Sequence, residues 1–160
     1  LPGKDGVFVP GNDLLKAVVV QRHDGSGRLA AGAVKGFGLK NGAVASTVAH
    51  DSHNLIAIGD NDRDILCAVG ELRRCQGGYT VCSGGRVLET LPLPVAGLFT
   101  DDASLDVAGR QKEISALCHR MGVPENIDPF QNLSFLSLTV IPEIRITDGG
   151  IFDVLNSKFL

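Results

Sequence analysis

The spacing of apolar and polar residues along the chain predicts four strands in its first sixty positions. The segment LLKAVVVQRH (14–23) ends in a β-branched apolar run, which indicates a strand buried on both faces. Residues 29–36 and 43–49 are built from small residues and glycines and predict two strands joined by the turn LKNG. HNLIAIG (53–59) predicts a fourth strand, again buried.

Helical spacing appears in two later segments, with a hairpin between them. The first helix is expected to start at a cap formed by Asp60 or Asn61 and to end at the glycine pair 77–78. YTVCSGGRVLETLPLP (79–94) has two β-rich arms around a Ser-Gly-Gly turn and predicts the hairpin. The second helix is expected over about 104–122, where apolar residues again recur on one side.

The remaining C-terminal stretch predicts loop and strand in alternation. DPFQNLSFLSLTVIPEIRITDGG contains a long apolar run bounded by prolines and a TDGG turn. Strands outnumber helices, so the expected fold class is α/β, with α+β as the alternative. The expected architecture is a layered sandwich, in which two main helices pack on a mixed β-sheet with hairpins. Residues 1–13 are interpreted as an N-terminal loop or linker, 14–154 as one domain and 155–160 as a tail.

Composition narrows the function classes. The 160 residues are 44% hydrophobic and carry a formal charge of −3, which fits a single domain with a real core. Basic residues are scattered and aromatic residues are few, so nucleic acid is not an expected partner. No apolar run approaches the roughly 18 residues that span a bilayer, so a membrane is not expected either. The chain begins LPGKDG without a methionine, which we interpret as the start of an excised piece of a larger protein.

The four cysteines predict reduced thiols rather than disulfides or a zinc site. None of them forms a CxxC pair, and each lies within an apolar or helical pattern. Buried or half-buried free thiols are typical of a reducing compartment, so a cytoplasmic location is expected. These residues are Cys67, Cys75, Cys82 and Cys118.

The stretch VAHDSHN (48–54) gathers an unusual number of side chains that can transfer protons or bind metals. A metal site is the first interpretation, but on a strand His50 and His53 would point to opposite faces and could not share an ion. A tight turn could bring them together, although a complete site would still need a third or fourth ligand. The stronger metal signals, HxH and HExxH, are absent from the chain. No metal site is therefore expected within this chain.

Two other interpretations of the same stretch stay open. In a catalytic site, Asp51 or Asn54 could orient a histidine that acts as general base or binds a purine edge. Ser52 lacks the GxSxG context of a nucleophile. In a structural turn, Asp and Asn side chains would bond neighbouring backbone amides between two strands. The residues by themselves favour the structural turn.

Two further motifs have simpler explanations. VKGFGLKNG contains GxG and offers Lys35 to an anion, yet it matches neither the GxGxxG nor the P-loop pattern. Small residues that pack a sheet explain its glycines equally well. The acidic residues at positions 60, 62 and 64 are those of a helix N-terminus, where carboxylates meet free amides.

Four long segments, taken together, resemble a known family. They are QRHDGSG, VKGFGLKNGAVASTVAHDSHN, LPLPVAGL and DPFQNLSFLSLTVIPEIRITDGGIFDV, and they resemble the C-terminal domain of bacterial-type adenine deaminases from about Lys16 to Val154. The resemblance implies a parent enzyme that hydrolyses adenine to hypoxanthine and ammonia in purine salvage. Such enzymes belong to the amidohydrolase superfamily, whose (β/α)₈ barrel holds manganese or iron through an HxH pair and further ligands. This chain lacks HxH and is shorter than a barrel of about 250 residues.

The resemblance therefore implies that this chain is an accessory domain that helps to close an active site held elsewhere. Its expected partners are the barrel domain and, through the full enzyme, adenine; the isolated chain is expected to be inactive. A non-catalytic binding module, or an oligomerisation module that forms a homo-oligomer, is the alternative, and an independent enzyme using His50 and Asp51 is a third. The candidate catalytic residues are His50, Asp51 and His53, and the candidate substrate-adjacent residues are Ser52, Asn54 and Lys35.

Overall fold

A six-stranded antiparallel sheet forms the centre of the structure, a computed structural model that describes residues 3–9, 11 and 13–160. The strand order is β4-β3-β6-β5-β7-β8, and every neighbouring pair is antiparallel. β5 and β6 lie at the middle, and their residues are buried on both faces. The strands are β3 (Leu14–Val20), β4 (Leu29–Lys35), β5 (Ala43–Ser46), β6 (Leu55–Gly59), β7 (Gly78–Ser83) and β8 (Arg86–Pro92).

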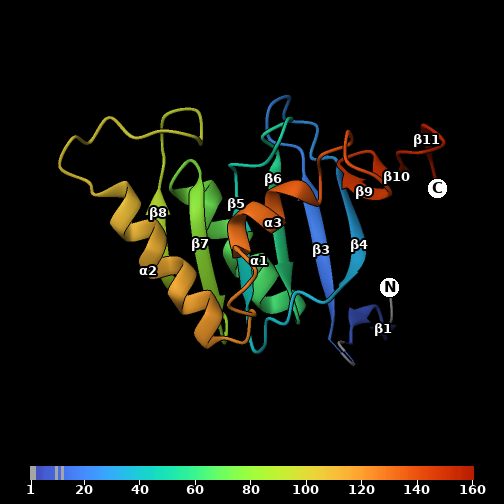
Figure 1. Cartoon of the computed structure of the whole chain (residues 1–160), viewed down its shortest axis with the longest axis horizontal. Coiled ribbons are helices and arrows are strands. Elements are labelled where there is room, and N and C mark those ends of the chain that lie inside the picture. The colour runs from blue at the N-terminus through green and yellow to red at the C-terminus, as the bar shows by residue number, and fades with distance from the viewer. Residues whose placement is uncertain (1–2, 10, 12) are drawn as a thin grey trace.

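Helices cover both faces of this sheet and make it the middle layer of three (Figure 1). Helix α1 (Asp62–Arg74) packs on one face, where its apolar side chains join a cluster with residues of β5 and β6. Helices α2 (Val107–Arg120) and α3 (Pro129–Phe135) pack on the other face over the larger cluster. This layering confirms the predicted α/β class.

Two small sheets flank the main one. β1 (Gly3–Lys4) and β2 (Val7–Phe8) form a hairpin within the segment expected to be a loop or linker; residues 1, 2, 10 and 12 of that segment lie outside the described residues. β9 (Ile144–Thr147), β10 (Gly150–Asp153) and β11 (Lys158–Phe159) form a sheet that contacts β4. Gly32 of β4 leaves the space that the side chain of Ile146 fills, because a Cβ there would lie 2.6 Å from its Cδ1.

Local chemistry explains most of the predicted elements. The side chain of Asn61 caps α1 by accepting a hydrogen bond from the amide of Asp64, as expected. The first predicted strand is shorter than expected and ends at Val20, before the loop 21–28. Its side chains alternate between buried and half-buried, so the expectation that both faces are buried was wrong. The second helix begins at Val107 rather than near Ser104, because Asp106 supplies the cap.

Helix α3 is the element that the sequence pattern missed. The segment was expected to contain only loop and strand, yet residues 129–135 are helical. Asp128 caps the helix by accepting hydrogen bonds from the amides of Phe130 and Gln131, and Pro129 fits the first turn. Seven residues give fewer than two full turns of periodicity, so the pattern could not separate this helix from a short strand.

The cysteines occupy the environments that were predicted. Cys82 and Cys118 are buried, Cys67 and Cys75 are half-buried, and all four are free thiols. Burial raises the pKa of Cys118 to about 12, which keeps it a neutral part of the core. Among the described residues, no helix combines the length and apolar character needed to cross a membrane.

Truncation of a buried side chain on a central strand should lower the stability of the domain. Ile58 of β6 is fully buried, so Ile58→Ala should lower the free energy of unfolding by about 2–5 kcal/mol. The matched control is Leu66→Ala, because Leu66 of α1 is 70% exposed. This substitution should change the free energy of unfolding by less than about 0.5 kcal/mol. Urea unfolding followed by circular dichroism measures both. Equal losses would contradict the assigned core.

Candidate functional site

The loops of the main sheet gather at its two opposite ends. Val20 pairs with both Leu29 and Leu55, so the loop 21–28 and the connection between β5 and β6 emerge at the same end. We call this the site end of the sheet. The connection contains VAHDSHN, which we call the histidine turn (residues 48–54). Lys35 lies at the opposite end, where it pairs with Leu14, and the structure does not bring it to the histidine turn.

The backbone of the histidine turn is held by α3 as well as by itself. The amide of His53, a residue with φ of 50°, donates to the carbonyl of Ala49 over 2.7 Å and closes the turn. The amide of His50 donates to Ser134 Oγ at 3.1 Å, and Ser137 Oγ donates to the carbonyl of His50 at 3.2 Å. These bonds satisfy polar groups that would otherwise be unpaired at the edge of the core.

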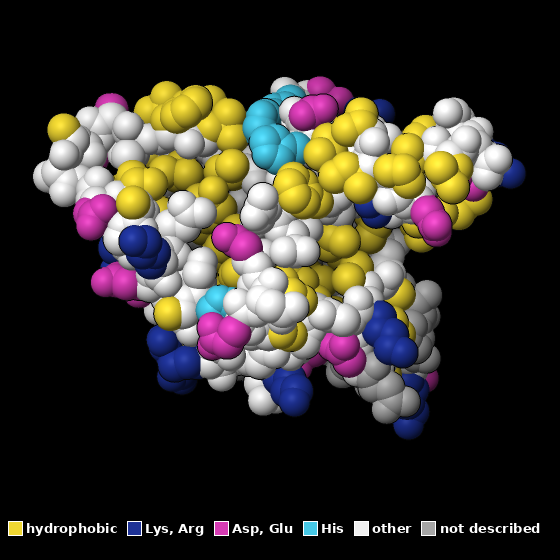
Figure 2. All heavy atoms as spheres, in the orientation of Figure 1, with side chains coloured by type: hydrophobic (Ala, Val, Ile, Leu, Met, Phe, Trp, Pro, Cys, Tyr) yellow, Lys and Arg dark blue, Asp and Glu magenta, His cyan; other side chains and the backbone are white. Residues whose placement is uncertain are grey.

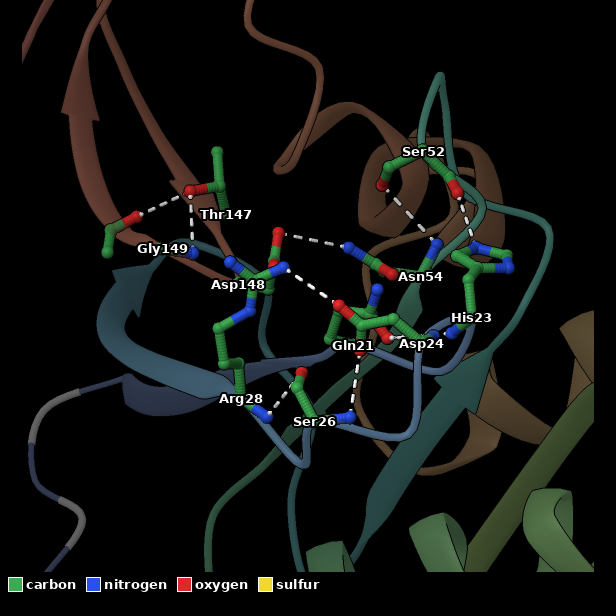
Figure 3. Close-up of polar contacts among 11 residues, drawn as sticks. Gln21, His23, Asp24, Ser26, Arg28, Ser52, Asn54, Thr147, Asp148 and Gly149 are labelled. Atoms are coloured by element: carbon green, nitrogen blue, oxygen red, sulfur yellow. Dashed lines mark hydrogen bonds and ion pairs between the residues drawn. The ribbon is translucent and has the colours of Figure 1, made fainter.

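Asn54 anchors the turn from behind. Its side chain is buried, and Nδ2 donates to Asp148 Oδ1 over 3.2 Å in the turn between β9 and β10 (Figure 3). A carboxylate only accepts hydrogen bonds, so this contact fixes the orientation of the amide. Asn54 Oδ1 then has no partner among the described residues. Arg28 lies 3.4 Å from the other oxygen of Asp148 and links this anchor to the loop 21–28.

The loop 21–28 supplies two further contacts to the histidine turn. His23 Nε2 donates to the carbonyl of Ser52 over 2.8 Å, which requires the Nε2–H tautomer (Figure 3). Arg22 Nε donates to the carbonyl of His53 over 2.5 Å. The histidine turn is thus bound to three segments that are distant in sequence.

The His53 ring is half-buried, and its surroundings favour the neutral imidazole. Burial, followed by the nearby His50 and Arg22, lowers the pKa of His53 below its ordinary 6.5. Its Nδ1 is buried and has no hydrogen-bond partner among the described residues. The His50 and His53 ring centroids are 6.2 Å apart, and the exposed His50 ring stacks on Phe135 at 6.1 Å. A neutral imidazole donates a hydrogen bond from one ring nitrogen and accepts one at the other, which suits a general base.

The described residues do not provide a metal-binding set at this turn. Nowhere among them do three or more His, Cys, Asp or Glu side chains come together as ligands for an ion. His50 and His53 could offer at most two nitrogens, and their rings are inclined by 55°.

Apolar side chains flank the histidines on the molecular surface (Figure 2). The turn 95–99 reaches the site end through a hydrogen bond from Arg22 Nη2 to the carbonyl of Ala96, and it exposes 44% of Val95 and 64% of Phe99. The segment after α3 exposes 73% of Val140. Exposed apolar side chains that gather on one part of a surface are typical of a region that contacts another protein part.

The structure groups five of the six residues singled out from the sequence. The catalytic and structural-turn interpretations both fit the turn, since its backbone is extensively bonded while His50 and Asp51 remain exposed. The pattern missed the residues that hold the turn in place. QRHDGSG carried a signal for two of them, but only the strand register shows that this loop meets the histidine turn. The residues missed are Arg22, His23, Ser134, Ser137 and Asp148.

The chain is a three-layer α/β domain with a polar turn at an exposed end of its sheet, and the comparisons identify its family. The family model described as "Adenine deaminase C-terminal domain" matches residues 1–158, and the chain belongs to that family. It is similar to the adenine deaminase of Desulfitobacterium hafniense, with 51% identity over 160 residues, 100% of this chain and 28% of that protein. The adenine deaminase of Halalkalibacterium halodurans is 48% identical over 159 residues, 98% of this chain and 27% of that protein. The chain thus spans little more than a quarter of these relatives.

The lowered pKa of His53 predicts a stability that depends on pH. The unfolded chain binds more protons at this site just below pH 6.5, so the contribution is complete above pH 6.5 and is lost as pH falls toward the folded pKa. Urea unfolding of the wild type and of His53→Gln between pH 5 and 8 measures it. The variant should lose less stability on acidification than the wild type; parallel pH dependences would contradict the assignment.

Proposed function

We propose that this chain is the C-terminal domain of an adenine deaminase, which hydrolyses adenine to hypoxanthine and ammonia in purine salvage in the cytoplasm. The domain would help to close an active site carried by the rest of the protein, an amidohydrolase barrel. Family membership supports the proposal, as do relatives that bear this name and are almost four times as long. Manganese or iron would be held by that barrel and would activate water when bound there.

The main support for the proposal is that the histidine turn has a fixed backbone but side-chain groups without partners among the described residues. Its backbone is bonded to α3 and to the loop 21–28, yet His50 and Asp51 remain exposed and His53 Nδ1 has no partner among the described residues. Buried polar atoms without partners are rare and concentrate where a ligand or a catalytic role uses them. The turn would bring a neutral imidazole and a carboxylate toward the purine, where they can hold it or move a proton.

Loss of these side chains should reduce catalysis and leave the fold intact. In the full-length enzyme, His50→Ala, Asp51→Ala or His53→Ala should lower kcat/KM for adenine by on the order of 10²-fold. His119→Ala is the matched control, because His119 lies on α2 and its Nδ1 bonds to the carbonyl of Val123. Steady-state kinetics with circular dichroism of each variant measures the effect. Near-normal kinetics for all three variants would leave the turn a purely structural element.

The isolated chain should fold without deaminating adenine. Its described residues form two hydrophobic clusters of their own, whereas the ligands that would hold the metal are proposed to lie in the barrel. The measurement is hypoxanthine formation by the 160-residue chain in the presence of manganese and adenine. Turnover above a blank that contains only the metal would contradict the proposal and would favour an independent enzyme.

A non-catalytic assembly module is the second candidate, because the C-terminal segment exposes apolar side chains of its own. Leu155, Phe159 and Leu160 are 66%, 58% and 71% exposed. Such a surface would suit contact between copies in a homo-oligomer. A histidine turn that tolerates substitution, together with a self-associating isolated chain, would favour this candidate over the first.

A further inference from the structure

Arg22 has an unusual environment for a charged side chain. Its half-buried guanidinium donates from Nε to the carbonyl of His53 at 2.5 Å and from Nη2 to the carbonyl of Ala96 at 2.7 Å. Burial lowers the pKa of Arg22, although a guanidinium remains charged. Among the described residues, no Asp or Glu forms an ion pair with it. A cation without a paired carboxylate is costly to bury, so its position calls for a role.

The turn 95–99 is shaped around this guanidinium. A Cβ at Gly97 would lie 2.8 Å from Arg22 Nη1, and the φ of Gly97 is +73°, which favours glycine. On the other side, Thr47 Oγ1 donates to the carbonyl of Gly97 over 2.6 Å and accepts from the amide of Gly78 at 2.8 Å. The turn that exposes Val95 and Phe99 is therefore fixed to the sheet through Thr47 and to the histidine turn through Arg22.

We propose that Arg22 is a positioning residue whose guanidinium ties the histidine turn to the turn 95–99, so that the His53 ring and the apolar side chains beside it face the partner domain as one rigid surface. The effect of Arg22 on catalysis rests on the proposed function, whereas its link between the two turns is a property of this chain. A planar guanidinium can hold two carbonyls in fixed directions, which an ammonium group cannot do.

The charged groups around His53 determine how the link made by Arg22 can be detected. His50 and Asp51 lie on the same turn, and Arg22 and His23 approach from the loop 21–28. From α3, Ser134 contacts the backbone of the turn and is uncharged. Removal of the Arg22 charge should therefore raise the pKa of His53. Burial lowers this pKa as well, so the effect of the charge is read from the difference between Arg22→Ala and a variant that keeps the charge.

The test begins with NMR titration of the histidines in the 160-residue chain. Arg22→Ala should raise the pKa of His53 and shift the amide resonances of the histidine turn and of residues 95–99. Arg22→Lys keeps the charge but loses the two-carbonyl geometry, so it should move the amide resonances and leave the His53 pKa nearer to that of the wild type. Arg86→Ala, at the opposite end of the sheet, is the matched control and should change neither.

A second variant approaches the tie from the other side. Gly97→Ala would push the guanidinium away while Arg22 is still present, and it should shift the same resonances. Gly36→Ala is its control, because Gly36 also has a positive φ, +89°, but a Cβ there would meet nothing within 4 Å. This pair separates displacement of Arg22 from the backbone strain that any side chain creates at such a position.

Kinetics of the full-length enzyme then separate this inference from the proposed function. If Arg22→Ala raises the pKa of His53 and lowers kcat/KM by on the order of 10- to 100-fold, the positioning role and the proposed function are both supported. If the substitution raises the pKa of His53 but leaves kcat/KM unchanged, Arg22 positions the two turns and the proposed function is wrong. Unchanged titration and unchanged amide resonances in Arg22→Ala and Gly97→Ala would overturn the positioning role, whatever the kinetics.

Discussion

The connection between β5 and β6 must satisfy its backbone polar groups at the end of two strands that are buried on both faces. Eight residues separate the strands, and their own turn bonds satisfy only part of these groups. Four further groups are paired by Ser134 of α3 and Ser137 just after it, and by Arg22 and His23 of the loop 21–28. Helix α3 is also held on the sheet by the buried side chains of Phe130 and Leu133, so the same helix contributes to the core and to the turn.

The same constraint accounts for the chemical character of the site end. Because the backbone of the turn is held from outside, the side chains of His50 and Asp51 are not needed to stabilise it and remain exposed. The buried Asn54 side chain stabilises the turn by donating a hydrogen bond to Asp148. The turn is therefore a hydrogen-bonded structure in its backbone, with exposed side chains at His50 and Asp51.

The sequence predicted the fold class, the central strands, α1 and the hairpin, because burial and helix capping leave local patterns. It missed α3, where seven residues give too little periodicity, and it overestimated the length of β3. In the site, the histidine turn was visible as a cluster of adjacent residues. Arg22 and Asp148 were not, because they reach the turn through strand register and a small C-terminal sheet, which no local pattern encodes.

The central claim is that the site end of the sheet faces the remainder of a longer enzyme. Hydroxyl-radical footprinting of the full-length enzyme and of the isolated 160-residue chain tests it most directly, with Phe99 and Leu66 as probes of 64% and 70% exposure in the chain. The account predicts that Phe99 and His50 become protected in the full-length enzyme, while Leu66 on α1 is oxidised equally in both. Equal oxidation of Phe99 and His50 in the two proteins would contradict it.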